Sequence, residues 1–433
     1  MPLGLYLSVP FCRTKCSFCN FASGVFSRPL FDRYVSHREG ELARAEQIAC
    51  EMGGVFEREV DSVYLGGGTP SVLAPDQLGA LFQAVQNNFT VLPGAEITVE
   101  VAPGTLSPEI LKVLLEAKVN RVSLGMQSFV DQETRSVGRL HTREITLADI
   151  ARLRENGIKE ISLDLIAGLP HQTAESWRYS LAETRAAGVP HVSVYMLEVD
   201  EDSRLGRELI AGGTRYHAHH VPDDDAIADF YLEACETFDG AGLKQYEISN
   251  FARNVEVPHL PKEGRYEAPE ASEVRESGAD PHLPRQGRDR TPDFPEYASR
   301  HNLKYWLRRP YLGFGVDAHS MLCAPRRDQP HAAVRFATTD NLDALLAGAA
   351  MSRTVVEEKN AVEEVFFLGL RLNQGVKLGQ VALEFGENAV GRYQSQIAEL
   401  TESGLVVVED GWLRLTNRGR LLSNDVFSRF LAD

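Results

Sequence analysis

Residues 3 to about 197 alternate short apolar runs with amphipathic stretches, and this alternation restricts the possible folds more than any other feature of the chain. The apolar runs are rich in valine, isoleucine and leucine, which is typical of strands in a sheet covered on both faces. The stretches between them repeat apolar residues at helical spacing. Repeated strand–helix units predict a parallel sheet. The pattern leaves two arrangements open, a partial barrel and an open doubly wound sheet.

Flanking residues locate the individual elements. Ser107 predicts a helix N-cap with Pro108 at the first helical position, and Gly157 and Gly188 predict helix ends. We expect strands at residues 3–9, 62–65, 96–101, 121–124, 160–166 and 191–197. We expect helices at residues 30–52, 75–88, 107–117, 146–156 and 174–187.

Three cysteines crowd together near the N-terminus as Cys12, Cys16 and Cys19, with C-x3-C-x2-C spacing. The chain lacks a transmembrane run and a signal-peptide core, so we expect a cytoplasmic protein, whose reducing surroundings favour metal or redox roles over disulfides. A loop of this length can place three thiolates around a four-iron cube and leave one iron open. The alternatives are a zinc site completed elsewhere and three unrelated thiols. The other cysteines lack ligand spacing and are not expected to bind metal: Cys50, Cys235 and Cys323.

A glycine run and several polar residues lie in or just beyond the expected strands, at the ends where parallel barrels place their sites. The run Gly66–Pro70 follows one strand directly and lets a backbone approach a ligand closely, although such turns are common. Asp164 stands within a buried strand pattern and needs a partner or a ligand. An internal ion pair with Arg139 is the alternative. The polar residues at these positions are Glu100, Gln127, Arg139 and Asp164.

Two later segments differ from this pattern. Residues 254–298 are rich in prolines and charges without apolar periodicity, so we expect a disordered insertion that cannot offset its ordering entropy. From about residue 360, two helical runs precede a hairpin turning at Asp410-Gly411 and a last helix reaching Phe430, the outline of a winged helix. The net charge of −16 and the lack of a basic recognition stripe argue against a nucleic-acid partner, so a winged-helix DNA-binding protein is a remote alternative.

Four segments together resemble radical S-adenosylmethionine (SAM) proteins, and more narrowly the oxygen-independent coproporphyrinogen III oxidases and their HemW relatives. The resemblance spans nearly the whole chain except the insertion 254–298 and implies an α/β fold, a partial (β/α)6 TIM-like barrel with a C-terminal winged-helix-like α+β domain. It divides the chain into a barrel core (1–200), an accessory region (201–355) and the C-terminal domain (356–433). The four segments are residues 6–19, 66–70, 125–129 and 164–170.

The resemblance also implies roles for individual residues. Cys12, Cys16 and Cys19 would ligate a [4Fe–4S] cluster whose open iron binds S-adenosylmethionine. The residues implied beside the cluster are Tyr6 and Phe18. Those implied to contact the methionine part of the cofactor are Gly67, Gly68 and Thr69. Those implied to bind its polar groups are Glu100, Gln127, Arg139 and Asp164.

Two features favour the HemW branch, which is similar to a heme chaperone. The run from His301 to Trp306 resembles that branch's HNxxYW signature, and Phe21 stands where the oxidases usually carry a further cysteine. His301 is therefore the candidate heme ligand, because neutral imidazole is a common axial ligand of heme iron. The implied partners are heme and heme-acceptor proteins, with the electron donor unnamed and a dimer left open. The main alternative is an oxygen-independent coproporphyrinogen III oxidase.

Overall fold

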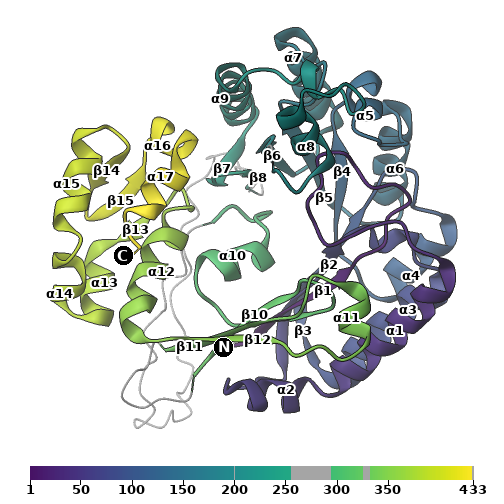
Figure 1. The fold of residues 1–433 in the computed structure, drawn as a ribbon, viewed down its shortest axis with the longest axis horizontal. Coiled ribbons are helices and arrows are strands. Elements are labelled where there is room, and N and C mark those ends of the chain that lie inside the picture. Colours follow the sequence, from purple (N-terminus) through teal and green to yellow (C-terminus); the bar gives the residue numbers. More distant parts are fainter. Residues whose placement is uncertain (199, 255–293, 325–331, 432–433) are drawn as a thin grey trace, which may run out of the picture.

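The computed structural model describes residues 1–198, 200–254, 294–324 and 332–431. Its main feature is a 12-stranded sheet in the order β12-β11-β10-β9-β1-β2-β3-β4-β5-β6-β8-β7. Strands β1 to β6 are parallel and lie side by side in chain order. A doubly wound sheet reverses its strand order at a switch point. Strands β1 to β6 do not, so their arrangement is the predicted partial (β/α)6 barrel, left open between the edge strands of the sheet (Figure 1).

The predicted strand–helix order is confirmed, with changes in the bounds. The parallel strands are β1 (Leu3–Val9), β2 (Glu59–Gly67), β3 (Thr90–Val101), β4 (Arg121–Gln127), β5 (Glu160–Ala167) and β6 (His191–Met196). The helices between them are α1 (Arg28–Ala43), α2 (Ala45–Met52), α3 (Pro75–Asn88), α4 (Pro108–Glu116), α5 (Asp131–Ser136), α6 (Arg143–Glu155) and α7 (Ala174–Ala187). The single helix expected over residues 30–52 is wrong, because the backbone of Arg44 leaves the helical region and divides it in two.

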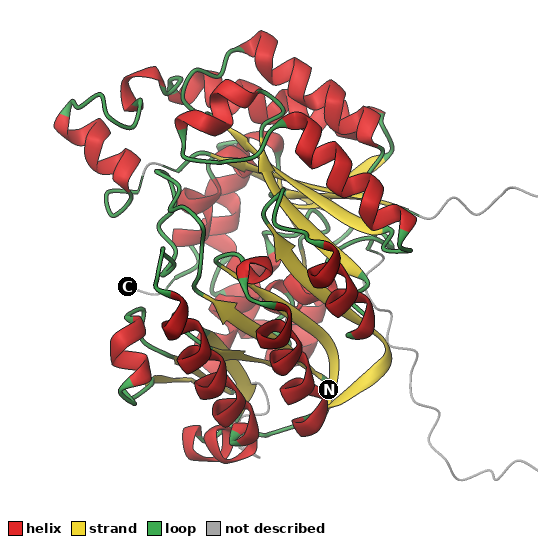
Figure 2. Cartoon of the chain, turned by 90° about the vertical axis from the view of Figure 1, so that its right-hand side faces the viewer, coloured by secondary structure: helices red, strands yellow, loops and turns green. Residues whose placement is uncertain are grey.

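The two faces of the parallel strands differ, which corrects the expectation of strands apolar on both sides. On β1, Leu5 and Leu7 are at most 1% exposed and belong to the main hydrophobic core. Tyr6 and Ser8 alternate with them and face the barrel interior, as the inward residues of the other strands do. Helices cover the outer face (Figures 1 and 2). The inward residues include Ser62, Tyr64, Glu96, Glu100, Ser123, Ser162, Asp164, His191 and Ser193.

Further strands widen the sheet on both sides. On one side β9 pairs parallel with β1, and on the other β8 pairs antiparallel with β6. These strands are β7 (Leu243–Glu247), β8 (Asn250–Arg253), β9 (Tyr311–Phe314), β10 (His319–Cys323), β11 (Ala333–Ala337) and β12 (Ser352–Val356). The helices of this region are α8 (Arg204–Ala211), α9 (Asp224–Gly240), α10 (Arg300–Trp306) and α11 (Leu342–Leu346). Strands from before and after residue 200 thus belong to the same sheet. The domain boundaries at 200 and 355 stay predictions.

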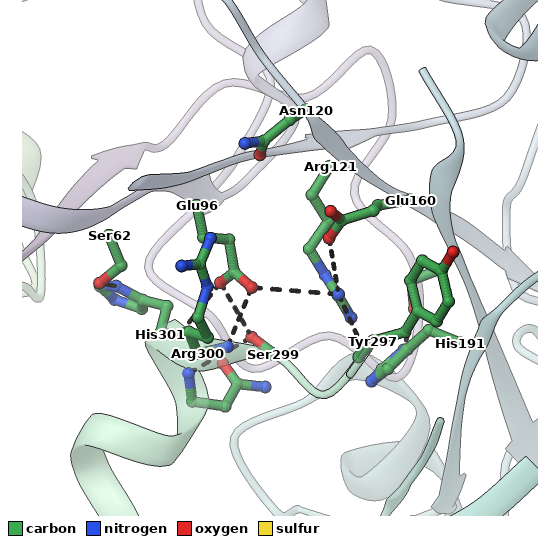
Figure 3. A network of polar contacts seen from close by, with 12 residues as sticks. Ser62, Glu96, Asn120, Arg121, Glu160, His191, Tyr297, Ser299, Arg300 and His301 are labelled. Carbon is green, nitrogen blue, oxygen red and sulfur yellow. Dashed lines mark hydrogen bonds and ion pairs between the residues drawn. The ribbon is translucent and has the colours of Figure 1, made fainter. Parts of the chain in front are cut away.

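Helix α10 lies inside the curve of the sheet, near the amino ends of the parallel strands (Figure 1). Its first turn is held by Glu96 of β3, whose carboxylate accepts hydrogen bonds from the backbone N–H groups of Arg300 (2.9 Å) and His301 (3.0 Å). Arg121 of β4 lies 4.0 Å from the same carboxylate and also donates to the carbonyl of Tyr297 at 2.9 Å (Figure 3). A carboxylate at a helix N-terminus satisfies its free N–H groups and complements its dipole.

The C-terminal segment has its own core and the predicted winged-helix-like outline. Asp410 and Gly411 both have positive φ, 51° and 78°, and form the predicted hairpin turn. The buried core includes Phe366, Leu413 and Phe430, each 0% exposed. Its helices are α12 (Glu358–Gly369), α13 (Leu378–Phe385), α14 (Glu387–Gly391), α15 (Gln394–Glu402), α16 (Asn417–Leu421) and α17 (Ser423–Ser428). Its antiparallel sheet, in the order β13-β15-β14, consists of β13 (Val376–Lys377), β14 (Val406–Glu409) and β15 (Trp412–Leu415).

The expected insertion 254–298 lies mostly outside the described residues, because 255–293 fall in a gap of the description. Its last five residues are described, and Ala298 among them is only 3% exposed. The insertion therefore ends earlier than predicted. Within the described ranges, no helix combines the length and apolar character needed to cross a membrane.

Candidate cofactor-binding site

The three cysteines lie in the loop that follows β1, and backbone hydrogen bonds fix this loop on two sides. Cys12 N donates to the carbonyl of Gly24 at 2.8 Å, and Ser17 N donates to that of Val137 at 3.1 Å. Cys16 is buried, whereas Cys12 and Cys19 are half-buried. Burial raises the pKa of both Cys12 and Cys16. Water stabilises the buried thiolates poorly, so a metal bound to these thiols must stabilise their negative charge.

The three thiols are not packed as closely as the ligands of one zinc ion. Sulfurs around one tetrahedral zinc ion lie about 3.8 Å apart, given Zn–S bonds of about 2.3 Å. Among the described residues, a set of three potential ligands within 4.8 Å of one another occurs only at a group of histidines, not at Cys12, Cys16 and Cys19. The three sulfurs are therefore not gathered as they would be around one zinc ion, and a larger group does not require that spacing.

The glycine run joins the end of β2 to the cysteine loop. Gly68 N donates to the carbonyl of Val9 at 2.9 Å, and Thr69 N donates to that of Phe11 at 2.8 Å. A Cβ added to Gly68 would lie 2.5 Å from the Val9 oxygen, so glycine is required for this close backbone contact. The hydroxyl of Thr69 also points to Cys12, with an oxygen–sulfur distance of 3.8 Å.

Glu100, near the carboxyl end of β3, connects the glycine run to the barrel interior. Its carboxylate accepts hydrogen bonds from Gly67 N at 3.2 Å and from the Tyr64 hydroxyl at 2.8 Å. Burial is the main cause that raises the pKa of Glu100 to about 7, and the nearby carboxylate of Asp164 adds to it. A cation bound here would stabilise the ionised form.

Asp164 does not form the ion pair that was the alternative for it. Both of its carboxylate oxygens accept from the Ser123 hydroxyl at 3.1 Å, and the described residues show no ion pair between Asp164 and Arg139. Arg139 lies instead against Gly125 and Gln127, and its Nε is buried without a hydrogen-bond partner in the described part of the chain. Burying a guanidinium nitrogen without a hydrogen-bond partner costs free energy. The Nε of Arg139 therefore indicates where an anionic group of a ligand could bind.

The remaining predicted residues line the same space or border it. Tyr6 lies on β1, and its hydroxyl would be 3.1 Å from a Cβ added at Gly67. Phe18 packs against a small hydrophobic cluster that includes Leu205 of α8. Gln127 ends β4 with a positive φ of 73°. Sequence reasoning missed Tyr64 and Ser123, although polar residues alternating with leucine and valine in the strands could have revealed them.

His301 lies deeper in the barrel than the cysteine loop, against the rings of Tyr64 and Tyr6 at centroid distances of 5.3 and 6.4 Å. Its Nδ1 is 3.0 Å from the Ser62 hydroxyl and its Nε2 is 2.8 Å from the Tyr305 hydroxyl. Ser62 and Gly66 are four residues apart on β2, which corresponds to roughly 13 Å. The ring is 1% exposed, and burial lowers the pKa of His301 to about 3. The imidazole of His301 is therefore neutral. Because both of its nitrogens are in hydrogen bonds, a metal could bind only after one of these hydrogen bonds is broken.

Three kinds of comparison with known proteins agree with one another, and together they span the whole chain. Residues 6–184 match the model of the radical SAM superfamily, and residues 356–422 match that of the HemN C-terminal domain. The heme chaperone HemW of Synechocystis sp. is 30% identical, with 88% of this chain and 81% of the relative covered. The HemW proteins of Bacillus subtilis (29% identical, 99% of both chains) and Escherichia coli (26% identical, 100% and 99%) are also similar. The structure of coproporphyrinogen III oxidase (HemN) from E. coli shares the fold, with a TM-score of 0.74 and 21% identity over 99% of this chain and 90% of the other.

Proposed function

Because the chain belongs to the HemW family of radical SAM proteins, we propose that it is a heme chaperone, which binds heme and transfers it to acceptor proteins. The observation that carries this proposal is the similarity to relatives named heme chaperones over nearly the full length of both chains. The oxidase alternative is supported by a shared fold, which hosts different functions in different proteins.

The cysteine loop is the proposed site of a [4Fe–4S] cluster, held by Cys12, Cys16 and Cys19. The C-x3-C-x2-C spacing and the lack of a fourth cysteine in the motif support a cluster with one open iron. When bound, such a cluster can supply an electron to the sulfonium of S-adenosylmethionine. Phe18 and Tyr6 would shield this region from water.

The charged groups beyond the loop fit the polar groups of S-adenosylmethionine. The free Nε of Arg139 offers a donor to the carboxylate of the cofactor. Glu100 and Asp164 offer acceptors to its ammonium and ribose hydroxyl groups, and Gln127 lies beside Arg139. Gly67 and Gly68, which pack closely against β1 and the loop that follows it, are proposed to contact the methionine part, and the hydroxyl of Thr69 points to Cys12. The protein thus binds and orients the cofactor, which carries the chemistry.

For heme, we propose His301 as the axial ligand. The support is the HNxxYW signature together with a neutral imidazole, which keeps a lone pair available at every pH above about 3. Binding requires Tyr305 to release Nε2, so α10 must shift or the tyrosine must rotate. The axial ligand would be distinct from the cysteine loop, because its partner Ser62 lies four residues before Gly66 on β2, roughly 13 Å along the strand.

The proposal includes a cytoplasmic location, an acceptor protein for heme, an electron donor that is still to be identified, and no nucleic-acid partner. The acidic net charge of −16 supports the last point. Whether two chains form a dimer can be measured by sedimentation.

The test is an anaerobic heme titration of cluster-loaded protein together with an assay on coproporphyrinogen III. A heme chaperone should give a Soret band at about one heme per chain and should pass this heme to an apo-acceptor. It should not decarboxylate coproporphyrinogen III with the cluster reduced and S-adenosylmethionine present. Many turnovers to protoporphyrinogen IX would establish the oxidase function instead.

A further inference from the structure

Three histidine rings from two separate segments converge beyond the carboxyl end of β5, outside the site described above. His171 lies in the turn between β5 and α7, and His217 and His220 bracket the short 3-10 helix η2 (Ala218–His220). One ring nitrogen from each lies within 4.8 Å of the other two. We propose that these three histidines bind one divalent transition-metal ion, with Zn²⁺ as the preferred metal, and that the ion ties η2 to the β5–α7 turn.

The backbone already holds the two segments together at this point. His171 N donates to the carbonyl of His220 at 2.9 Å, and His220 N donates to that of His217 at 2.9 Å. His217 has a φ of 61°, which is uncommon for a residue with a side chain and tends to persist only where surrounding structure requires it. The rings are therefore brought together by fixed backbone rather than by flexible loops.

The distances suit a zinc ion after small ring rotations. Zinc–nitrogen bonds of about 2.0–2.1 Å with tetrahedral angles place imidazole nitrogens about 3.4 Å apart. His171 Nε2 and His217 Nδ1 are 3.3 Å apart. His171 and His217 are half-buried and His220 is exposed, so the ion can enter and water can complete its coordination.

The donor chemistry selects the class of metal. Imidazole nitrogen suits Zn²⁺, Cu²⁺ and Ni²⁺, whereas Mg²⁺ and Ca²⁺ prefer oxygen ligands. An imidazole with the ordinary pKa of about 6.5 is mostly neutral at pH 7 and can offer a lone pair to a metal.

The proposed ion would also stabilise residues 200–220, which contact the cysteine loop. Leu205 at the start of α8 donates its N–H to the carbonyl of Ser17 at 2.8 Å. Asn20 of the same loop donates to the side chain of Asp200 at 2.6 Å. Residues 200–220 therefore run from the cysteine loop to the histidines. Zn²⁺ should slow hydrogen exchange over residues 204–220 in the full-length protein.

The test is equilibrium dialysis of cluster-loaded, full-length protein against Zn²⁺, with iron and zinc counted separately. About one zinc per chain is expected, and His171→Ala or His217→Ala should weaken binding at least tenfold. His219→Ala is the matched control: its ring lies 4.0 Å from His220 but outside the trio, so binding should stay within about twofold. Unchanged affinity in His171→Ala, or an equal loss in His219→Ala, would overturn the proposal.

Zinc-edge X-ray absorption of the wild-type protein decides the question even if a variant fails to fold. A shell of nitrogen and oxygen at about 2.0–2.1 Å with imidazole scattering supports the histidine site. A sulfur shell at about 2.3 Å would show that zinc binds to thiols and would overturn the proposed histidine site. Absence of stoichiometric zinc at micromolar metal would show that the rings only contact one another.

Discussion

His301 and His191 occupy matching surroundings inside the barrel. In His301, Nδ1 contacts the Ser62 hydroxyl and Nε2 the Tyr305 hydroxyl; in His191, the corresponding partners are serine and tyrosine hydroxyls at 2.7 and 3.0 Å. Both rings are at most 3% exposed, and burial lowers the pKa of each. Only His301 belongs to the HNxxYW signature. The pair therefore offers a matched comparison between the proposed heme ligand and an equally buried histidine outside the signature.

We predict that His301→Ala weakens heme binding at least tenfold, about 1.4 kcal/mol, and shifts the Soret band. The iron–sulfur absorbance should stay unchanged, because the proposed cluster ligands are Cys12, Cys16 and Cys19 and not His301. His191→Ala removes an equally buried imidazole and should leave heme affinity within about twofold. Heme titrations of both variants measure this difference. Unchanged binding and spectrum in His301→Ala would assign the ligand to another residue.

The cysteines give a second prediction. Anaerobically reconstituted protein should hold about four irons per chain, and Cys16→Ala should abolish the broad visible absorbance of the cluster. Cys235→Ala is the control, because Cys235 is half-buried on α9, away from the loop. Iron analysis and visible spectra provide the measurement. A Cys16→Ala protein that keeps its spectrum, or a Cys235→Ala protein that folds but loses iron, would contradict the assigned ligands.

The ends of the insertion give a third prediction. Tyr297 N donates to the carbonyl of Arg253 at 3.3 Å, so the chain leaves and re-enters the described structure at neighbouring points. Replacing residues 256–292 by a short glycine–serine linker should therefore keep the melting temperature within about 4 °C and preserve the iron content. Extending the deletion through Ala298 should be far more damaging, because that residue is buried. Collapse of the shorter deletion would show that residues 256–292 stabilise the fold.

Local signals were sufficient for the strand–helix order. The Ser107 side chain accepts from Ile110 N as its N-cap role predicts, and Gly188 ends α7 with a φ of 62°. The division at Arg44 had no such signal, because neither glycine nor proline marks it. Strand β9 was also missed, since its pairing with β1 joins residues about 300 positions apart and depends on tertiary contacts.

The candidate site was predictable to the extent that its motifs follow strand ends. The structure brings Glu100, Gly67 and the cysteine loop together as expected. The location of His301 could not be predicted, because it depends on how Glu96 holds the first turn of α10 across the barrel. The lack of a pair between Asp164 and Arg139 likewise reflects side-chain placement that spacing does not encode.

A fourth prediction concerns Glu96, which is 1% exposed and holds both the helix N-terminus and Arg121. Glu96→Ala should lower the free energy of unfolding by about 1–3 kcal/mol, because it removes the acceptor of two backbone N–H groups of α10 and one of the two carboxylates beside Arg121, the other being Glu160. Glu46→Ala removes an exposed pair with Arg58 and should cost less than about 1 kcal/mol. Urea denaturation compares the two variants. Equal midpoints would mean that α10 is held by other contacts.

The last prediction follows from the raised pKa of Glu100, about 7, which burial causes in the protein without cofactor. If the cationic part of S-adenosylmethionine binds beside this carboxylate, it favours the ionised form, so binding releases a proton when the pH is below 7. The affinity of cluster-loaded protein should therefore increase about tenfold between pH 6 and pH 8 and then level off. Calorimetry in two buffers with different ionisation enthalpies measures both the affinity and the proton release. Glu100→Gln cannot titrate, so it should bind more weakly at pH 8 and lose most of the pH dependence. A Glu100→Gln protein that keeps the full pH dependence would place the titrating group elsewhere, and affinity that falls with increasing pH would contradict cation binding at Glu100.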